Sequence, residues 1–450
     1  MARTAKKEKA LTPEEKLAQA LVPDVEQPYR VPENWCWVTI HSINQYQSIT
    51  VDPTKQKDST FELYSVPSSA ENYPEIVSGD EIGSSKQKVK KGDVLLCKIN
   101  PRINRVWKVT KFTDNTLLAS SEWIVIRNQR INSDYLMYCF RSPYFREYML
   151  SSVSGVGGSL MRAQPKHVQL YPVPLAPFAE QQRIVDRVES LFAKLNEAKE
   201  KAQAVVDGFE DRKAAILHKA FKGELTKKWR DSNGIGFDSW CSKSINAICH
   251  SLKYGTAKKS EPSGPVVVLR MGNLQEGEID WSDLAYTTDK EDIEKYHLEP
   301  NDVLFNRTNS AALVGKTSIY RGEYPAIYAG YLIKLDYDHD IMIGDFLNYA
   351  LNTQDAKEYC NSVKTDGVNQ SNINAKKIGA YVIPVPSIKE QEQIVTLLKS
   401  LIAKERQAKE AAEQVIDQID AMKKSILARA FRGELGTNDP VDEPAIELLK

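Results

Sequence analysis

Apolar residues recur in alternating steps of four and three along two long, otherwise polar stretches, residues 180–225 and 390–435. This spacing lines up one apolar stripe on a helix and predicts helices that pack together as in a coiled coil. Arg212 interrupts the first stripe and Glu405 the second. The residues predicted to pack helix against helix are Ile184, Val188, Leu191, Leu195, Ala198, Ala202, Val205, Phe209 and Ile216 in the first stretch, and Ile394, Leu398, Leu401, Ala408, Ala412, Val415, Ile419, Met422 and Ile426 in the second.

The two stretches are copies of each other. EQQRIVDRVESLF returns as EQEQIVTLLKSLI and AFKGEL returns as AFRGEL, and roughly half of all positions are identical without a gap. A repeat of this length indicates two copies of one structural unit. We expect each copy to form one long helix, starting near Pro177 or Ser387 and ending before Gly223 or Gly433. Because a large segment separates the copies, we expect the two helices to pack antiparallel.

Weaker echoes of the same duplication run through the segments that precede the long helices. They follow in one order: WC at residues 35 and 240, GDVLLCK at 92 and NDVLFNR at 301, DYLMY at 134 and DFLNY at 345, and REY at 146 and KEY at 357. In the first segment we expect strands over residues 35–40, 93–99 and 122–126 and one helix over 134–150. The sequence therefore predicts an α+β protein, with two similar mixed α/β domains and two long antiparallel helices in a pseudo-two-fold repeat.

The predicted order of domains follows from these repeats. It is an N-terminal extension with a short helix (1–28), a first globular domain (29–177), a first long helix (178–225), a linker with a second globular domain (226–386), a second long helix (387–435) and a tail (436–450). In the extension, Thr12 followed by Pro13, Glu14 and Glu15 has the pattern of a helix start. Two interpretations of the extension stay open, a tail without fixed contacts and a segment that docks on the long helices.

Composition narrows the class of protein. A chain of 450 residues is too long for one core and suits several domains. Its 60 Lys and Arg balance 60 Asp and Glu, so any binding to nucleic acid must come from local patches. Six cysteines without CxxC spacing are typical of reduced thiols, and no apolar run predicts a signal peptide or a membrane span. A cytoplasmic location is expected.

No sequence motif points to catalysis. The six histidines are isolated, and HExxH, cysteine and histidine metal spacings and a Walker lysine are missing. The Asn-Pro-Pro-aromatic motif of adenine N6 methyltransferases is missing too, since Arg102 follows Asn100-Pro101. We therefore expect no catalytic residue, no metal and no cofactor in this chain. Two hypotheses of other classes stay open, an enzyme, for instance a fused methyltransferase or nuclease remnant, and a coiled-coil scaffold with protein-binding lobes.

A variable segment followed by a PxP, EQxxIV and FxGEL helix, twice in one chain, resembles the DNA specificity subunit of type I restriction-modification systems. The resemblance runs from YRVPENW at residue 29 to FRGEL at residue 431 and is strongest in the long helices. It implies two target-recognition domains, held apart by two antiparallel helices, that each read one half of a bipartite DNA site. It also implies that the helices dock two methyltransferase subunits, which bind S-adenosylmethionine, and that restriction subunits then join. The divergence of the two domains predicts an asymmetric target.

In the first globular domain, a basic stretch is the candidate DNA contact. Residues 86–111 carry nine Lys and Arg against the single acid Asp93, and lysine and arginine neutralise phosphates, while arginine also reads guanine. A mobile loop, SGVGGSLMRAQ at residues 154–164, is a second candidate. A solvated charged face is the alternative interpretation. The predicted DNA-binding residues of this domain are Lys86, Lys88, Lys98, Arg102, Asn104, Arg105, Lys108, Ser159, Arg162 and Gln164.

The second globular domain has no basic excess, with 18 Lys and Arg against 21 acids over residues 227–386. Its candidates are therefore loops, LKYGTAKKS, LRMGN, NRTNS and GVNQSN, in which Asn and Gln can pair with adenine. Ordinary turns have a similar composition, which leaves a purely structural role open. The predicted DNA-binding residues are Lys253, Tyr254, Lys258, Lys259, Arg270, Asn273, Arg307, Asn309, Asn369, Gln370 and Asn372.

Overall fold

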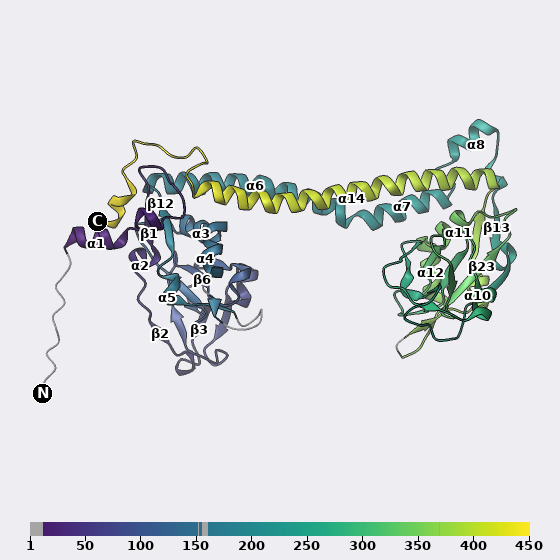
Figure 1. Cartoon of the computed structure of the whole chain (residues 1–450), viewed down its shortest axis with the longest axis horizontal. Coiled ribbons are helices and arrows are strands. Elements are labelled where there is room, and N and C mark those ends of the chain that lie inside the picture. Colours follow the sequence, from purple (N-terminus) through teal and green to yellow (C-terminus); the bar gives the residue numbers. More distant parts are fainter. Residues whose placement is uncertain (1–11, 152, 155–160, 369) are drawn as a thin grey trace. The chain divides into compact units, whose positions relative to one another are not determined.

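The computed structural model describes residues 12–151, 153–154, 161–368 and 370–450, with only the backbone of residues 153 and 154. The chain divides into two compact units (Figure 1). Unit 1 comprises Met1–Ala202 and Gln414–Lys450, and unit 2 comprises Gln203–Glu413. Each unit contains one globular domain and a part of both long helical stretches. We refer to the globular domains as lobe 1 (residues 29–177) and lobe 2 (residues 238–386).

The second copy of the repeat forms one uninterrupted helix, α14 (Ile388–Ala430), as predicted. For the first copy the prediction of one helix is wrong, because the chain forms α6 (Phe178–Asp207) and α7 (Phe209–Phe221), separated by Gly208. The second copy carries Gln418 at the corresponding position. Glycine costs about 1 kcal/mol in a helix relative to alanine, so the first copy is locally weaker than the second.

Arg212, which breaks the predicted stripe, lies across this interruption. Its guanidinium donates to the Val205 carbonyl at 2.8 Å and to the Glu405 carboxylate of α14 at 2.6 Å. A β-carbon at Gly208 would lie 2.6 Å from a nitrogen of the same guanidinium, so a larger residue there would displace the end of the Arg212 side chain. The two polar residues that interrupt the stripes therefore pair with each other.

Within each unit the long helices pack antiparallel, as predicted. In unit 1, Lys199 of α6 pairs with Asp420 of α14 at 2.9 Å, and the Lys423 ammonium lies 5.7 Å from the ring centre of Phe192. In unit 2, the Lys409 ammonium lies 5.1 Å from the ring centre of Phe209. Residue numbers rise along one helix where they fall along the other, which defines the antiparallel sense.

Most of the predicted packing residues are buried or half-buried, but the prediction is wrong at four positions, which are exposed. Val415 and Met422 are 41% and 50% exposed, and Ala198 and Ala408 are exposed as well. The stems of Lys199, Lys409 and Lys423 lie in the contact instead, because a straight helix drifts away from a strict seven-residue repeat and long side chains can cover apolar surface. The packing residues that are buried or half-buried are Ile184, Val188, Leu191, Leu195, Ala202, Val205, Phe209, Ile216, Ile394, Leu398, Leu401, Ala412, Ile419 and Ile426.

Lobe 1 is built of small sheets covered by helices. Its strands are β1 (Cys36–Thr39), β2 (Thr50–Val51), β3 (Thr60–Tyr64), β4 (Glu75–Ser78), β5 (Lys86–Lys88), β6 (Val94–Cys97), β7 (Val106–Lys108), β8 (Thr116–Ala119), β9 (Trp123–Ile126), β10 (Val153–Ser154), β11 (Arg162–Ala163) and β12 (Pro172–Leu175). They form sheets in the orders β2-β5-β8-β3-β4 and β7-β6-β9 and the pairs β1-β12 and β10-β11. The helices are α2 (Ile40–Ile43), α3 (Ser133–Arg141), α4 (Pro143–Ser151) and α5 (Pro165–Val168).

The three strands predicted in lobe 1 are confirmed as β1, β6 and β9, each slightly shorter than expected. The single helix predicted over 134–150 is wrong. It is two helices, α3 and α4, that meet at Ser142, because the residue before Pro143 is driven out of helical geometry.

Lobe 2 repeats the central part of this arrangement. Its strands are β13 (Cys241–Ser244), β14 (Cys249–Tyr254), β15 (Val266–Leu269), β16 (Leu274–Gln275), β17 (Glu278–Ile279), β18 (Tyr286–Thr287), β19 (Val303–Asn306), β20 (Thr308–Asn309), β21 (Thr317–Ile319), β22 (Ala326–Tyr328), β23 (Leu332–Tyr337), β24 (Thr365–Asp366), β25 (Ser371–Asn372) and β26 (Val382–Val385). The helices are α9 (Ile245–Ile248), α10 (Lys290–Tyr296), α11 (Gly344–Leu351), α12 (Gln354–Val363) and α13 (Ala375–Gly379), and α8 (Lys227–Asn233) lies in the linker.

The duplication is visible in the pairing of strands. The pair β13-β26 in lobe 2 matches β1-β12 in lobe 1, and the strands β23-β19-β21 match β9-β6-β7. The helix pair α11 and α12 likewise follows the pattern of α3 and α4. The lobes differ in their other sheets, since lobe 2 has β18-β15-β22 and the hairpin β16-β17 where lobe 1 has its sheet of five strands.

A buried glutamate fastens the start of each long helical stretch to its lobe. In unit 1, the carboxylate of Glu180 is fully buried and accepts from the Trp35 indole at 2.7 Å. It also accepts from the amide of Asn438 at 2.8 Å and the hydroxyl of Thr437 at 3.1 Å, both in the tail after α14. A buried carboxylate is stable when such donors replace water, so Glu180 joins three distant segments of the chain.

Glu390 does the same in unit 2, with one change of donor. It is fully buried and accepts from the Trp240 indole at 3.0 Å and from the Thr226 hydroxyl at 2.6 Å. Its third donor is the guanidinium of Arg230 in α8, which makes a buried ion pair. We call these two sites lock 1 (Trp35, Glu180, Thr437 and Asn438) and lock 2 (Trp240, Glu390, Thr226 and Arg230).

The glutamine after each glutamate positions the helix pair of its lobe. Gln181 accepts from the backbone amide of Asn132 at 2.8 Å, and Gln391 accepts from that of Ile343 at 2.9 Å. Asn132 and Ile343 are the residues directly before α3 and α11. The repeated EQ dipeptide thus fixes the start of the first strand and the start of the helix pair in each lobe relative to the long helices.

The N-terminal extension forms the predicted helix, α1 (Pro13–Ala20), with a capping box between Thr12 and Glu15. Beyond it, the Val22 amide donates to the Trp37 carbonyl at 2.9 Å, so the chain pairs with β1 of lobe 1. Over its described part the extension is therefore neither a free tail nor a segment docked on the long helices. Among the described residues, no helix is long and apolar enough to cross a membrane.

Candidate nucleic-acid interface

Two of the loops predicted in lobe 2 meet in the structure. The NRTNS loop forms β20 and the GVNQSN loop forms β25, and these strands pair through Thr308 with Asn372 and Asn309 with Ser371. The short strand β24 completes a sheet of three. Gln370 is exposed beside this sheet, and Asn369 lies outside the described residues. The small sheet presents several polar side chains of the prediction at one place.

Arg307 lies at the centre of this cluster. Its guanidinium lies 4.8 Å from the centre of the Tyr254 ring, and it donates to the Gly330 carbonyl at 3.2 Å and the Asn372 side-chain oxygen at 3.4 Å. Its Nε is buried without a hydrogen-bond partner in the described part of the chain. Asn372 in turn donates to the Thr308 hydroxyl at 2.8 Å. We call Tyr254, Arg307, Thr308 and Asn372 the lobe 2 cluster.

The chemistry of this cluster suits an anionic or hydrogen-bonding ligand. None of the ion pairs among the described residues includes Arg307, so its charge is held by an aromatic face and neutral oxygens. A guanidinium held in this way loses little conformational freedom when it donates two parallel hydrogen bonds. Tyr254 is 40% exposed and its hydroxyl accepts from the Ala375 amide at 2.9 Å, which fixes the ring.

Other predicted residues of lobe 2 have partners inside the lobe. Lys258 pairs with Asp289 at 2.7 Å and with Asp292 at 3.3 Å, and its hydrogen bond to Asp289 raises the pKa of the lysine. Lys253 pairs with Asp336 at 3.0 Å, whereas Lys259 is exposed in the loop that follows. The two paired lysines therefore hold loops in place, and their contact with DNA stays a prediction.

The LRMGN loop is also held from within. Arg270 pairs with Asp283 at 2.9 Å. Asn273 is 3% exposed and donates its amide hydrogens to the carbonyls of Asp280 and Asp283, both at 2.9 Å. This arrangement favours the structural interpretation of Asn273, since its side chain has no exposed polar group to offer.

Lobe 1 has a matching arrangement made of different residues. The Ala163 amide donates to the Lys98 carbonyl at 2.8 Å, and Ile99 bridges to Arg162. The KINPRINR stretch therefore pairs with MRAQ, as NRTNS pairs with GVNQSN in lobe 2. Lys98 takes the place of Arg307 and Arg162 that of Asn372, and both lie beside Glu122, at 4.0 Å and 3.2 Å. Gln164 is exposed next to them.

The reading loop predicted beyond β6 is a rigid turn. A 3-10 turn, η4 (Pro101–Ile103), is flanked by Asn100 and Asn104, which have positive φ of 46° and 51°. Asparagine tolerates this left-handed conformation better than most residues. The turn exposes Arg102 and Ile103 at its tip, and Ile103 is 54% exposed.

The remaining predicted residues of lobe 1 are spread over its sheets. Lys88 is exposed on β5, and the Lys86 ammonium donates to Ser84. Lys108 on β7 pairs with Asp134, and Arg105 is half-buried after η4. Ser159 lies outside the described residues. The structure thus brings Lys98 and Arg162 together with Gln164, and leaves Lys86, Lys88 and Lys108 elsewhere in the lobe.

Sequence reasoning missed Tyr331 in lobe 2. Its ring is 49% exposed and its backbone carbonyl accepts from the Arg307 amide at 3.0 Å, so it borders the lobe 2 cluster. Tyr331 lies between a glycine and a strand, and nothing in this local sequence indicates whether its ring is exposed or buried. The lobe 2 cluster as a whole depends on pairing between loops more than sixty residues apart, between Thr308 and Asn372.

Known proteins of one kind are similar to this chain. The sequence model of the type I restriction modification DNA specificity domain matches residues 238–416. The StySPI specificity subunit of Salmonella potsdam is 26% identical over 319 residues, with 70% of this chain and 68% of the relative covered. Over these regions the chain is similar to the DNA specificity subunits of type I restriction-modification systems. The EcoKI specificity subunit of Escherichia coli (strain K12) is 27% identical over 331 residues, with 71% and 69% covered.

Solved structures of specificity subunits show the same α+β fold. The HsdS subunit from Thermoanaerobacter tengcongensis has a TM-score of 0.62 at 21% identity, and the match covers 91% of this chain and all of that one. A chain from a study of complex assembly in a type I restriction-modification system has a TM-score of 0.73 at 20% identity, with the same coverage. The family resemblance and the fold class drawn from the sequence are confirmed. Its curated relatives carry the name of specificity subunits.

Proposed function

We propose that this specificity subunit reads a bipartite, asymmetric target on double-stranded DNA, with one half-site for each lobe. The observation that carries the proposal is the lobe 2 cluster, in which Arg307 and Asn372 are preset side by side. At the matching place lobe 1 has Lys98 and Arg162 beside Glu122. Two similar scaffolds with different polar side chains at one position are suited to two different sequences.

The side chains support reading of base edges. Arginine donates two hydrogen bonds to guanine in the major groove, and asparagine forms a similar pair with adenine. A good bidentate pair contributes about 1–3 kcal/mol of discrimination against the wrong base. Because Tyr254 and the Gly330 carbonyl already hold the Arg307 guanidinium, less ordering is needed on binding.

The chemistry belongs to partners in this proposal. The chain docks two methyltransferase subunits through its long helices, and restriction subunits join the complex. S-adenosylmethionine is bound by the methyltransferase, and the target adenine is flipped out of the duplex into that partner's pocket. The chain itself supplies target choice and no catalytic residue.

The experiment is modification-sensitive sequencing of DNA from a methylation-free host that expresses this chain with its methyltransferase. A split motif with methyladenine in both halves, missing from a host with the methyltransferase alone, is the expected result. An Arg307→Gln variant should relax one half of the motif only, and the matched control Lys290→Gln on α10 should leave both halves unchanged. No new methylation, with both proteins folded and associated, would support the scaffold alternative instead.

A further inference from the structure

A cleft of about 510 Å³ in unit 1 lies between the η4 turn of lobe 1, the junction of α3 with α4, and α14. Arg141 and Arg146 come from the helix pair, Asn104 from the turn, and Lys424 from α14. Figure 1 shows α3 and α4 on the side of lobe 1 that faces the long helices of the same unit. The predicted DNA-binding residues include none of Arg141, Arg146 and Lys424.

Among the described residues, no ion pair involves Arg141, Arg146 or Lys424 of this cleft. Arg141 donates to the Val106 carbonyl at 2.8 Å and Arg146 donates to the Arg102 carbonyl at 2.5 Å. In the described part of the chain neither arginine forms an ion pair, and the one acid in the lining, Glu147, is exposed. Burial lowers the pKa of Arg141, and the carboxylate of Asp134, which is paired with Lys108, offsets this effect only in part.

Two buried polar atoms of the same cleft have no hydrogen-bond partner among the described residues. They are the Arg146 Nε, a donor, and the Asn104 side-chain oxygen, an acceptor. Buried polar groups normally find a partner, so unsatisfied ones mark a place for a ligand or water. The side-chain nitrogen of Asn104 already donates to the Phe140 carbonyl at 3.2 Å, which fixes the turn against α3.

The corresponding cleft of lobe 2 is arranged differently. Asn352 stands at the position of Arg141 and donates to the Thr317 carbonyl at 3.0 Å, as Arg141 does to Val106. Lys357 stands at the position of Arg146. The hairpin β16-β17 adds Glu276 and Glu278 to this cleft. The lobe 2 cleft therefore contains carboxylates and a neutral amide where lobe 1 contains two arginines.

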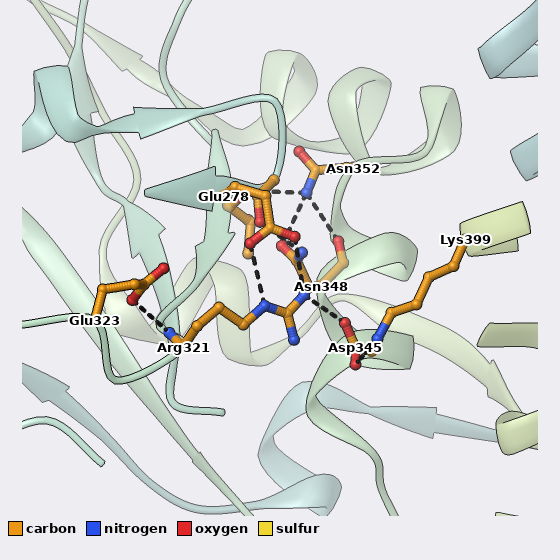
Figure 2. A network of polar contacts seen from close by, with 9 residues as sticks. Glu278, Arg321, Glu323, Asp345, Asn348, Asn352 and Lys399 are labelled. Carbon is orange, nitrogen blue, oxygen red and sulfur yellow. Dashed lines mark hydrogen bonds and ion pairs between the residues drawn. The ribbon is translucent and has the colours of Figure 1, made fainter. Parts of the chain in front are cut away.

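Those carboxylates are already paired. Figure 2 shows Arg321 between Glu278 and Asp345, with Lys399 of α14 on the other side of Asp345. Burial raises the pKa of Asp345, but the hydrogen bonds from Arg321 and Lys399 outweigh it and leave that pKa below its usual range. Glu276 pairs with Arg406 at 3.1 Å. The polar groups of lobe 2 thus bind one another, whereas those of lobe 1 are left for a ligand.

We propose that the lobe 1 cleft binds a backbone phosphate of the target DNA through Arg141, Arg146 and Lys424. This inference rests on the proposed function and deepens it. A guanidinium matches the geometry of a phosphate, and phosphate contacts set the register of a protein on DNA without reading sequence. Arg146 also holds the carbonyl of Arg102, so a phosphate there places the exposed tip of η4 next to the bases.

The test uses the complex of the full chain with its methyltransferase subunits and a fluorescent duplex that contains the target. The Kd is measured by anisotropy at several salt concentrations for Arg146→Gln, Lys424→Gln and both together. Each lost phosphate contact should reduce the slope of log Kd against log salt by about one, and should weaken binding to all sequences alike. Arg146→Lys should keep most of the slope, and Lys357→Gln in lobe 2 should leave it unchanged.

Four outcomes would overturn the inference. An unchanged slope in the double variant would show that these residues do not bind a phosphate, and it would leave the proposed function intact. A loss confined to duplexes altered in one half-site would make these residues base readers. A loss of methyltransferase binding, seen as a smaller complex by sedimentation, would make the cleft a protein interface. If the wild-type complex binds no DNA at all, the proposed function fails together with the inference.

Discussion

Lock 1 and lock 2 both attach a long helical stretch to its lobe, but the donors around the buried glutamate differ in charge. Both bury a glutamate at the start of a long helical stretch and both use a tryptophan indole as donor. Lock 1 completes the set with neutral groups, Thr437 and Asn438, whereas lock 2 uses the cation Arg230. The geometry of attachment is therefore kept in both halves while the side chains around it change. The two lobes differ less in their locks than in their loops, where a specificity subunit is expected to recognise its DNA target.

Removal of the buried carboxylate should expose this difference most strongly. Glu390→Gln leaves the Arg230 guanidinium buried without a counter-ion, which costs about 3–5 kcal/mol. Glu180→Gln leaves neutral donors, at a cost of about 1–3 kcal/mol. Hydrogen exchange, which follows each unit separately, should show a large loss of protection in unit 2 and a smaller one in unit 1. Equal losses would mean that Arg230 adds nothing to lock 2.

The cysteines that follow the two lock tryptophans give a second contrast. Burial raises the pKa of Cys36 to about 12, while Cys241 is exposed. At pH 8 a thiol with that pKa has about a thousandfold less thiolate than one with the reference value. A thiol reagent at pH 8 should therefore modify Cys241 rapidly and Cys36 only after unfolding. Mass spectrometry of the labelled peptides measures both rates, and similar rates would place Cys36 at the surface.

The reading clusters of the two lobes should differ in how much one residue matters. Arg307→Lys keeps the charge but loses the planar fork, so discrimination at one base pair should fall by about 1–3 kcal/mol, or roughly 5- to 150-fold. Lys98→Gln in lobe 1 should weaken binding more evenly across sequences, because a lysine makes a less directional contact. Competition binding with single-base variants of each half-site measures both effects. An even loss for Arg307→Lys and a base-specific loss for Lys98→Gln would mean that Lys98 reads a base and that Arg307 does not.

The smallest difference concerns the ion pairs between the long helices. Arg212 and Glu405 of unit 2 have side chains 37% and 27% exposed, against 36% and 55% for Lys199 and Asp420 of unit 1. Solvent screens both pairs, but Arg212 also satisfies the Val205 carbonyl. Arg212→Ala should cost about 1 kcal/mol and Lys199→Ala about 0.3 kcal/mol. Thermal unfolding monitored by circular dichroism should show a larger decrease in Tm for Arg212→Ala than for Lys199→Ala.

Repetition and periodicity made much of the fold predictable. The copied stretches predicted two helical arms and their antiparallel sense, and the capping residues predicted the start of α1 at Thr12. Local chemistry was less well captured where one residue decides. Gly208 divides the first arm, and Pro143 divides the helix predicted over 134–150. Both are residues whose backbone effect can outweigh the apolar pattern around them.

The candidate site could be predicted only in part, because its geometry depends on distant pairing. The loops with Arg307 and with Asn372 were recognisable by composition, but their union in one small sheet is a long-range event. The roles of Lys258 and Asn273 were equally hidden, since their partners Asp289 and Asp283 stand in loops with no pattern of their own. Arg141 and Arg146 lie in a helix pair that is otherwise largely apolar, and they belong to no motif.

Lock 1 also sets an order of events during synthesis. Lobe 1 leaves the ribosome first, yet the carboxylate of Glu180 obtains two of its donors only when Thr437 and Asn438 have been made. The core of lobe 1 likewise includes Leu427, Phe431 and Ala445, whereas lock 2 is complete as soon as Glu390 emerges. The half that is translated second is thus finished first, and in an incompletely translated chain the Glu180 carboxylate has Trp35 but lacks its other two donors.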